Sequence, residues 1–61
     1  MIHAKINNKI VKTRAYKTTC FGAYEFTIVK IDGEWLKLRR RMGNKYFFYF
    51  ETLPNQDKKY L

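Results

Sequence analysis

Three short turn signals divide the chain into stretches of alternating residues. They are "NN" at 7–8, "DG" at 32–33 and "GN" at 43–44. Asn and Gly tolerate the positive φ that two-residue hairpin turns require. Between these signals, apolar residues alternate with polar ones and seldom recur at the three-to-four spacing of a helix. The pattern therefore predicts an antiparallel sheet joined by tight turns.

Five strands are expected. A hairpin joins residues 1–6 to 9–16, residues 17–22 form a connection, and a meander follows over 23–31, 34–41 and 45–51. In the first hairpin an apolar face is expected from Ile2, Ala4, Ile6, Val11, Thr13 and Ala15. The opposite face is mostly basic and carries Lys5, Lys12 and Arg14.

The tail, residues 52–61, holds the only proline. Pro54 has no backbone N–H, so a central strand is excluded there. We expect a short helical turn, with Tyr60 or Leu61 folded back. The whole chain, residues 1–61, is predicted to be a single small all-β domain: a five-stranded antiparallel barrel or a strongly bent sheet with this C-terminal turn.

The segment "DGEWLKLRRRMGNKYFFYFETLPNQDKKYL" resembles the second half of SH3-like barrels. Those barrels have an acidic-Gly turn, a tryptophan that starts the next strand, a further hairpin and a Pro-containing helical turn. The resemblance implies an SH3-like barrel, with an OB-like barrel as the alternative. The first half lacks the acidic, tyrosine-bearing motif that grips proline-rich peptides, so that ligand is not expected.

The charge is strongly positive: 13 Lys/Arg against 5 Asp/Glu give +8 on 61 residues. Such a field favours an acidic partner. No basic amphipathic helix points to a membrane surface. No apolar run resembles a signal peptide or a membrane span, so a cytoplasmic location is expected.

One expected strand places its charges on a single face. Leu36 and Leu38 point one way along residues 34–41, and the opposite face carries Trp35, Lys37, Arg39 and Arg41. Burying an unpaired charge costs several kcal/mol. The leucines therefore face the core and the charged stripe faces outward.

The register of the last strand has two solutions. A three-residue loop at 42–44 sets Leu38 opposite Phe48, makes Tyr46, Phe48 and Phe50 core, and turns Lys45, Phe47, Tyr49 and Glu51 outward. A two-residue loop at 43–44 sets Leu38 opposite Tyr49 and puts Tyr46, Phe48 and Phe50 on the charged face. We favour the first, because Lys45 and Glu51 then lie in water.

The Asp-Gly turn raises the same question. A plain two-residue turn exposes Tyr24, Phe26 and Ile28 together. A loop extended over 32–34 buries those three side chains and places Glu25 near Arg41. Asp-Gly locally favours the shorter turn, but the burial of three large side chains favours the longer one.

These registers define a candidate interface of rings interleaved with cations. Bases stack on exposed rings while cations track phosphates. The candidate nucleic-acid-binding residues are Trp35, Lys37, Arg39, Arg41, Lys45, Phe47 and Tyr49, with a secondary basic face of Lys5, Lys12 and Arg14. The structural alternative is that the N-terminal hairpin or the tail covers Trp35 or Phe47.

Catalytic chemistry is not indicated. The chain has no serine, one histidine (His3) and one cysteine (Cys20). The acidic residues are scattered, and each glycine fits a turn. No enzyme activity, metal site or cofactor is expected.

The leading expectation is a non-enzymatic protein that binds RNA or single-stranded DNA. The alternative is a small phage or mobile-element protein that binds and modulates an acidic host protein such as a polymerase or nuclease. Aromatic and arginine side chains on one face serve both roles. An edge-to-edge homodimer is a third option.

Overall fold

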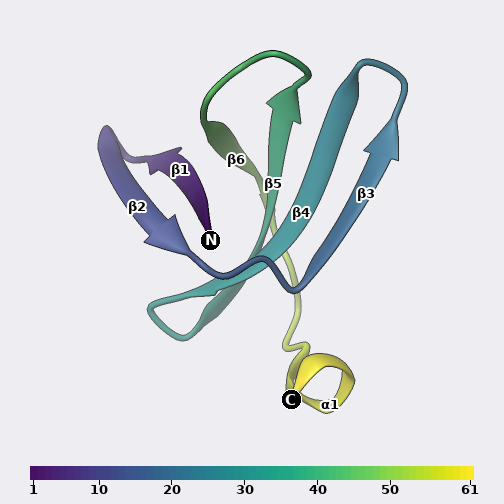
Figure 1. Cartoon of the computed structure of the whole chain (residues 1–61). Helices are drawn as coiled ribbons and strands as arrows, with labels where there is room; N and C mark the ends of the chain where they lie inside the picture. The colour runs from purple at the N-terminus through teal and green to yellow at the C-terminus, as the bar shows by residue number, and fades with distance from the viewer.

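The computed structural model describes residues 1–61, which form one bent sheet followed by a helical turn (Figure 1). The elements are β1 (Ile2–Ile6), β2 (Lys9–Thr13), β3 (Lys17–Phe21), β4 (Tyr24–Ile31), β5 (Glu34–Arg41), β6 (Phe47–Thr52) and α1 (Asp57–Tyr60). The strand order is β2-β1-β6-β5-β4-β3. Neighbours are antiparallel except β1 and β6, which are parallel. The all-β fold with a C-terminal helical turn is confirmed. The sheet has six strands rather than five, and it is open, with β2 and β3 as its edges.

The additional strand is β3, which the sequence indicated only as a connection. It pairs with β4 from Lys17 opposite Ile28 to Phe21 opposite Tyr24. All five of its residues are exposed. An edge strand with no buried face shows no apolar alternation, so its backbone hydrogen bonds have no signature in the sequence. Gly22 takes the positive φ, 61°, in the turn to β4.

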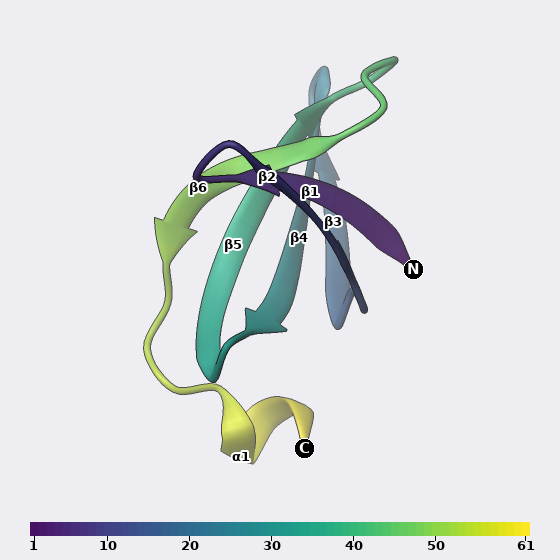
Figure 2. The same ribbon diagram turned by 90° about the vertical axis from the view of Figure 1, so that its left-hand side faces the viewer.

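The N-terminal hairpin folds over one face of the β3–β6 meander (Figure 2). Its turn is the predicted one, because Asn7 and Asn8 have φ of 52° and 63° and Ile6 pairs with Lys9. The core lies between this hairpin and the meander and consists of Ala4, Val29, Leu36, Leu38 and Phe47. We call the meander face toward the hairpin the inner face and the opposite one the outer face.

The turn between β4 and β5 corrects one prediction. Asp32 and Gly33 form a plain two-residue turn with φ of 51° and 80°, and Ile31 pairs with Glu34. The inner face of β4 is supplied by Thr27, Val29 and Ile31. The alternate residues are therefore forced outward: Tyr24, Phe26 and Ile28 lie opposite Arg41, Arg39 and Lys37. The longer loop was wrong, and Glu25 accordingly pairs with Arg40 rather than Arg41.

The register of β6 corrects a second prediction. Leu38 pairs with Tyr49 and Arg39 with Phe48, whereas Leu36 pairs with Thr52. The shift between the two pairs leaves Phe50 as the extra residue of a bulge. Phe47 is buried in the core, because its parallel pairing with Ala4 of β1 places it under the hairpin. The predicted core positions of Phe48 and Phe50 were therefore wrong, since both lie on the outer side.

The tail folds as expected after Pro54. Residues 57–60 form one helical turn, and the Tyr60 ring packs back against Trp35. Leu61 stays exposed. The four-residue α1 is the only helix, so no helix has the length or apolarity to cross a membrane.

Candidate nucleic-acid interface

The outer face of the meander carries rings on two strands with cations on the strand between them. The rings belong to β4 and β6, and the cations belong to β5. Alternation along each strand sends these side chains away from the core. We call this set the aromatic-cationic face: Tyr24, Phe26, Lys37, Arg39, Arg41, Phe48 and Phe50.

Arg39 lies at the centre of this face, between two rings. Its guanidinium carbon lies 4.7 Å from the centroid of Tyr24 and 5.3 Å from that of Phe50. Lys37 lies one step along β5, with Nζ 5.1 Å from the Phe26 centroid and 5.9 Å from the Phe50 centroid. Phe26 and Phe50 pack edge to face with centroids 5.3 Å apart. The rings hold the two cations in place, while 42% of Phe50 remains exposed.

Little negative charge opposes these cations. Glu51 lies 4.0 Å from Lys37, and both side chains are substantially exposed. The other two ion pairs of the protein lie elsewhere, Arg40 with Glu25 and Lys30 with Asp57. Arg39 and Arg41 are exposed and make no ion pair. Their charge is therefore available to an anionic partner.

Arg40 has a different role from its two neighbours. It lies on the inner side of β5, donates to Glu25 at 2.6 Å and donates to the Asn44 carbonyl at 3.2 Å. Its guanidinium carbon lies 5.0 Å from the Phe47 centroid. Arg40 thus fixes the loop before β6 and shields the core.

Trp35 is on the outer face of β5 but is only 3% exposed, because Tyr16 and, from α1, Tyr60 pack against it. Its ring packs against Tyr16 and Tyr60, with centroid distances of 4.9 Å and 5.5 Å. Its Nε1 donates to Asp57 at 2.9 Å, and Lys30 Nζ donates to the same oxygen at 3.0 Å. The hydrogen bonds from Lys30 and then Trp35 hold the pKa of Asp57 below its ordinary value of 3.8. These residues lie together beneath or in α1, and we call them the covered end of the outer face: Tyr16, Lys30, Trp35, Asp57 and Tyr60.

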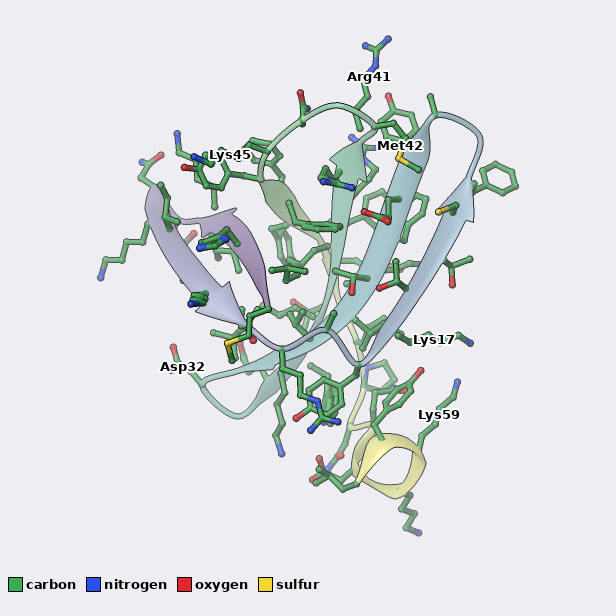
Figure 3. All side chains as sticks on the ribbon, in the orientation of Figure 1. Lys17, Asp32, Arg41, Met42, Lys45 and Lys59 are labelled. Atoms are coloured by element: carbon green, nitrogen blue, oxygen red, sulfur yellow. The ribbon has the colours of Figure 1, made fainter.

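Only part of the predicted site is assembled. Lys37, Arg39 and Arg41 share the outer face, but Trp35 and Phe47 are buried. Tyr49 is exposed on the side of Leu38, and its hydroxyl hydrogen-bonds that of Thr52 at 2.8 Å. Lys45 lies in the loop before β6; Figure 3 shows it on the hairpin side of the molecule, apart from Arg41.

Four members of the aromatic-cationic face were not among the predicted site residues: Tyr24, Phe26, Phe48 and Phe50. The signal for them was present in the sequence. The two-residue turns at 32–33 and 43–44 each place a set of rings on the charged face. The observed pairing follows the first turn throughout β4–β5 and the second only at Leu38–Tyr49 and Arg39–Phe48, before the bulge. The longer loops were favoured because the one at 42–44 leaves Lys45 and Glu51 in water and the one at 32–34 buries three large side chains.

The secondary basic face has a simpler character. Lys5 and Lys12 lie on the exposed side of the N-terminal hairpin, and the adjacent Ile10 is exposed as well. Arg14 lies beyond β2, with its guanidinium carbon 4.9 Å from the Tyr16 centroid. No array of exposed rings accompanies these cations, so this surface offers charge without a stacking platform.

Comparisons with family models, curated protein sequences and solved structures gave no match to this chain. No three side chains of the metal-ligating types come together. The outer face is therefore the feature of the molecule from which a function can be inferred.

Proposed function

We propose that this protein binds single-stranded nucleic acid, RNA or DNA, on the aromatic-cationic face and without catalysis. One observation carries the proposal: Arg39 is exposed, makes no ion pair and is held between the rings of Tyr24 and Phe50. Exposed rings accept bases by stacking, and adjacent cations contact the phosphates. The positive net charge of the chain adds a favourable long-range field.

The face suits a single strand better than a duplex. Bases within a duplex are already stacked on each other, whereas those of a single strand are free to stack on protein rings. Little sequence preference is expected, because every base has a π-face. The architecture that we attach to this proposal is a small barrel-like sheet of the SH3 or OB kind, and OB-folds bind oligonucleotides on a sheet face.

The test is a fluorescence anisotropy titration with labelled RNA and DNA oligomers of about 10 nucleotides. At about 50 mM salt we expect a Kd tighter than ~100 µM, the weak end of ordinary non-specific binding. A duplex of the same sequence should bind more weakly. If neither single strand binds within this range, the proposed function is wrong.

A second candidate function uses the same surface. Exposed Tyr and Arg side chains are typical anchors of protein interfaces, and Tyr24 with Arg39 forms such a pair. The partner would be an acidic host protein that this chain modulates. A pull-down before and after nuclease treatment separates the two functions. One stoichiometric protein partner that survives nuclease favours this candidate, and loss of all partners favours nucleic acid.

A further inference from the structure

A hollow of about 330 Å³ opens on the outer face where α1 meets the meander. Three lysines and three rings line it, contributed by β3, β4, β5 and α1: Lys17, Phe21, Phe26, Lys37, Lys59 and Tyr60. We propose that this hollow holds one nucleotide of the bound strand, with its base against the rings and its phosphate among the lysines. The inference rests on the proposed function and adds a defined subsite to it.

The charges around the hollow are suited to a phosphate. No acidic residue lines it. Lys17 and Lys59 make no ion pair and both line the hollow, one from the start of β3 and one from α1 (Figure 3). Lys37 approaches from the sheet, and its contact with Glu51 is a long, exposed one. Lysine ammonium groups from separate elements can surround a phosphate as point charges.

The rings that line the hollow favour a nucleotide over an inorganic anion as its ligand. Phe21 is 78% exposed at the edge of the sheet, although it is one of the largest apolar side chains of the chain. Phe26 and Tyr60 provide further walls. An aromatic base recovers the cost of exposing such rings by stacking on them. The volume lies at the lower end of the ~300–1,000 Å³ range of small-molecule sites, which suits one nucleotide.

The hollow is continuous with the aromatic-cationic face. Phe26 and Lys37 belong to both, and Phe26 packs directly against Phe50. A strand that crosses Phe50 and Phe26 therefore reaches the hollow at its next step. The bound strand would thus run from the loop end of β5 toward α1.

The helix offers a matched pair of variants. Lys59 lines the hollow, whereas the adjacent Lys58 is exposed and does not. Lys59→Gln and Lys58→Gln remove the same charge from the same helical turn. One phosphate contact contributes about 0.7 to the log–log salt slope of a single strand, so its loss at about 50 mM salt lowers affinity by about eightfold. We expect this loss for Lys59→Gln and less than about twofold for Lys58→Gln, with equal thermal melts.

A backbone amide NMR titration with uridine 5′-monophosphate locates the subsite directly. Saturable shifts are expected at Lys17, Thr19 and Tyr60, with weaker effects from uridine or inorganic phosphate alone. If oligomers bind but these amides do not respond, or if the two lysine variants lose affinity equally, the subsite is wrong while the proposed function stands. If no oligomer binds the wild-type protein, the function itself fails, and the subsite fails with it.

Discussion

The two ends of the outer face carry the same kinds of side chain but differ in what lies above them. At one end Trp35 and Tyr16 lie beside Lys30, beneath α1. At the other end Tyr24 and Phe50 flank Arg39, with no element above them. Rings beside cations are therefore core in one place and surface in another, on the same sheet face.

The difference depends on one carboxylate. α1 brings Asp57 over the first end, where it accepts hydrogen bonds from both the Trp35 indole and Lys30. That contact satisfies the indole N–H of Trp35 and the ammonium of Lys30, as polar groups taken out of water require. At the open end no carboxylate reaches Arg39. A covered end with its own acid stabilises the fold, and an open end without one is left for an external anion.

The largest expected effect is on stability at the covered end. Trp35→Ala removes a buried indole and should lower the free energy of unfolding by ~3–5 kcal/mol. A 61-residue chain has little stability to spare, so this variant should be largely unfolded near room temperature. Phe48→Ala at the open end is the control and should cost about 1 kcal/mol or less, because Phe48 is half exposed. Thermal melts followed by circular dichroism compare the two, and equal melting temperatures would contradict the assignment of Trp35 to the core.

The next effect is on binding at the open end. Phe50→Ala removes one stacking ring, so affinity for a single strand should fall by about tenfold or more. Its stability cost should be only about 1 kcal/mol, mainly the edge-to-face contact with Phe26. Anisotropy titrations and melts of the same sample separate these effects. A folded Phe50→Ala protein with wild-type affinity would remove Phe50 from the interface.

Acid should reduce the stability that the covered end contributes to the fold. The folded-state pKa of Asp57 lies below its ordinary value of 3.8, so its stabilising contribution is complete above that value and is lost as pH falls through the lowered pKa. Trp35, the only tryptophan, reports on this through its fluorescence. Asp57→Asn should be less stable than wild type near pH 7, and the difference should shrink in acid.

Asp32→Asn is the control for the acid effect. Asp32 lies in the β4–β5 turn and bonds to neither Lys30 nor Trp35, and Asn-Gly forms the same kind of turn. Its fluorescence profile against pH should match that of wild type. An Asp57→Asn protein whose stability difference from wild type did not shrink as the pH was lowered would contradict the role given to Asp57.

The smallest expected effect is on the stability contributed by one hydroxyl group of α1. The Tyr60 hydroxyl is shielded from solvent and has no hydrogen-bond partner. Tyr60→Phe keeps the ring against Trp35 and removes an unsatisfied group, so stability should stay within about 1 kcal/mol of wild type or rise slightly. Tyr60→Ala should lower the melting temperature clearly. Similar losses in both variants would mean that the hydroxyl contributes a bond.

Local chemistry in the sequence predicted the parts of the fold that are locally determined. Asn7-Asn8 set the first hairpin, alternation set the faces of β5, and Pro54 with the residues after it set the helical turn. The sequence did not show which side chains of β6 face the core, because the parallel pairing of Ala4 with Phe47 and the bulge at Phe50 depend on the tertiary fold. β3 was missed because its exposed residues show no pattern.

The candidate site was also predicted only in part: its cations were predicted correctly and its rings were not. The β5 cations follow from strand alternation, since Lys37 and Arg39 do lie opposite the core face. The rings beside them depended on two turn lengths. The longer loops were favoured, one to leave Lys45 and Glu51 in water and the other to bury three large side chains of residues 23–31. Trp35 was placed on the correct side of its strand, but the carboxylate that covers it comes from Asp57, 22 residues further along the chain.

The central claim is that the aromatic-cationic face and the hollow beside it contact phosphates, whereas the Arg14 side of the covered end does not, and one matched pair of arginines tests it most directly. Arg39 stacks over Tyr24 at the open end, and Arg14 stacks over Tyr16 at the covered end, at 4.7 Å and 4.9 Å. The measurement is single-strand affinity against salt for wild type, Arg39→Ala and Arg14→Ala. Contacts from Lys17, Lys37, Arg39, Arg41 and Lys59 predict a wild-type slope of log K against log[salt] of about −3.5. Arg39→Ala should flatten this slope by about 0.7, and Arg14→Ala should leave it unchanged. A slope that flattens equally in both variants, or only in Arg14→Ala, would contradict the claim.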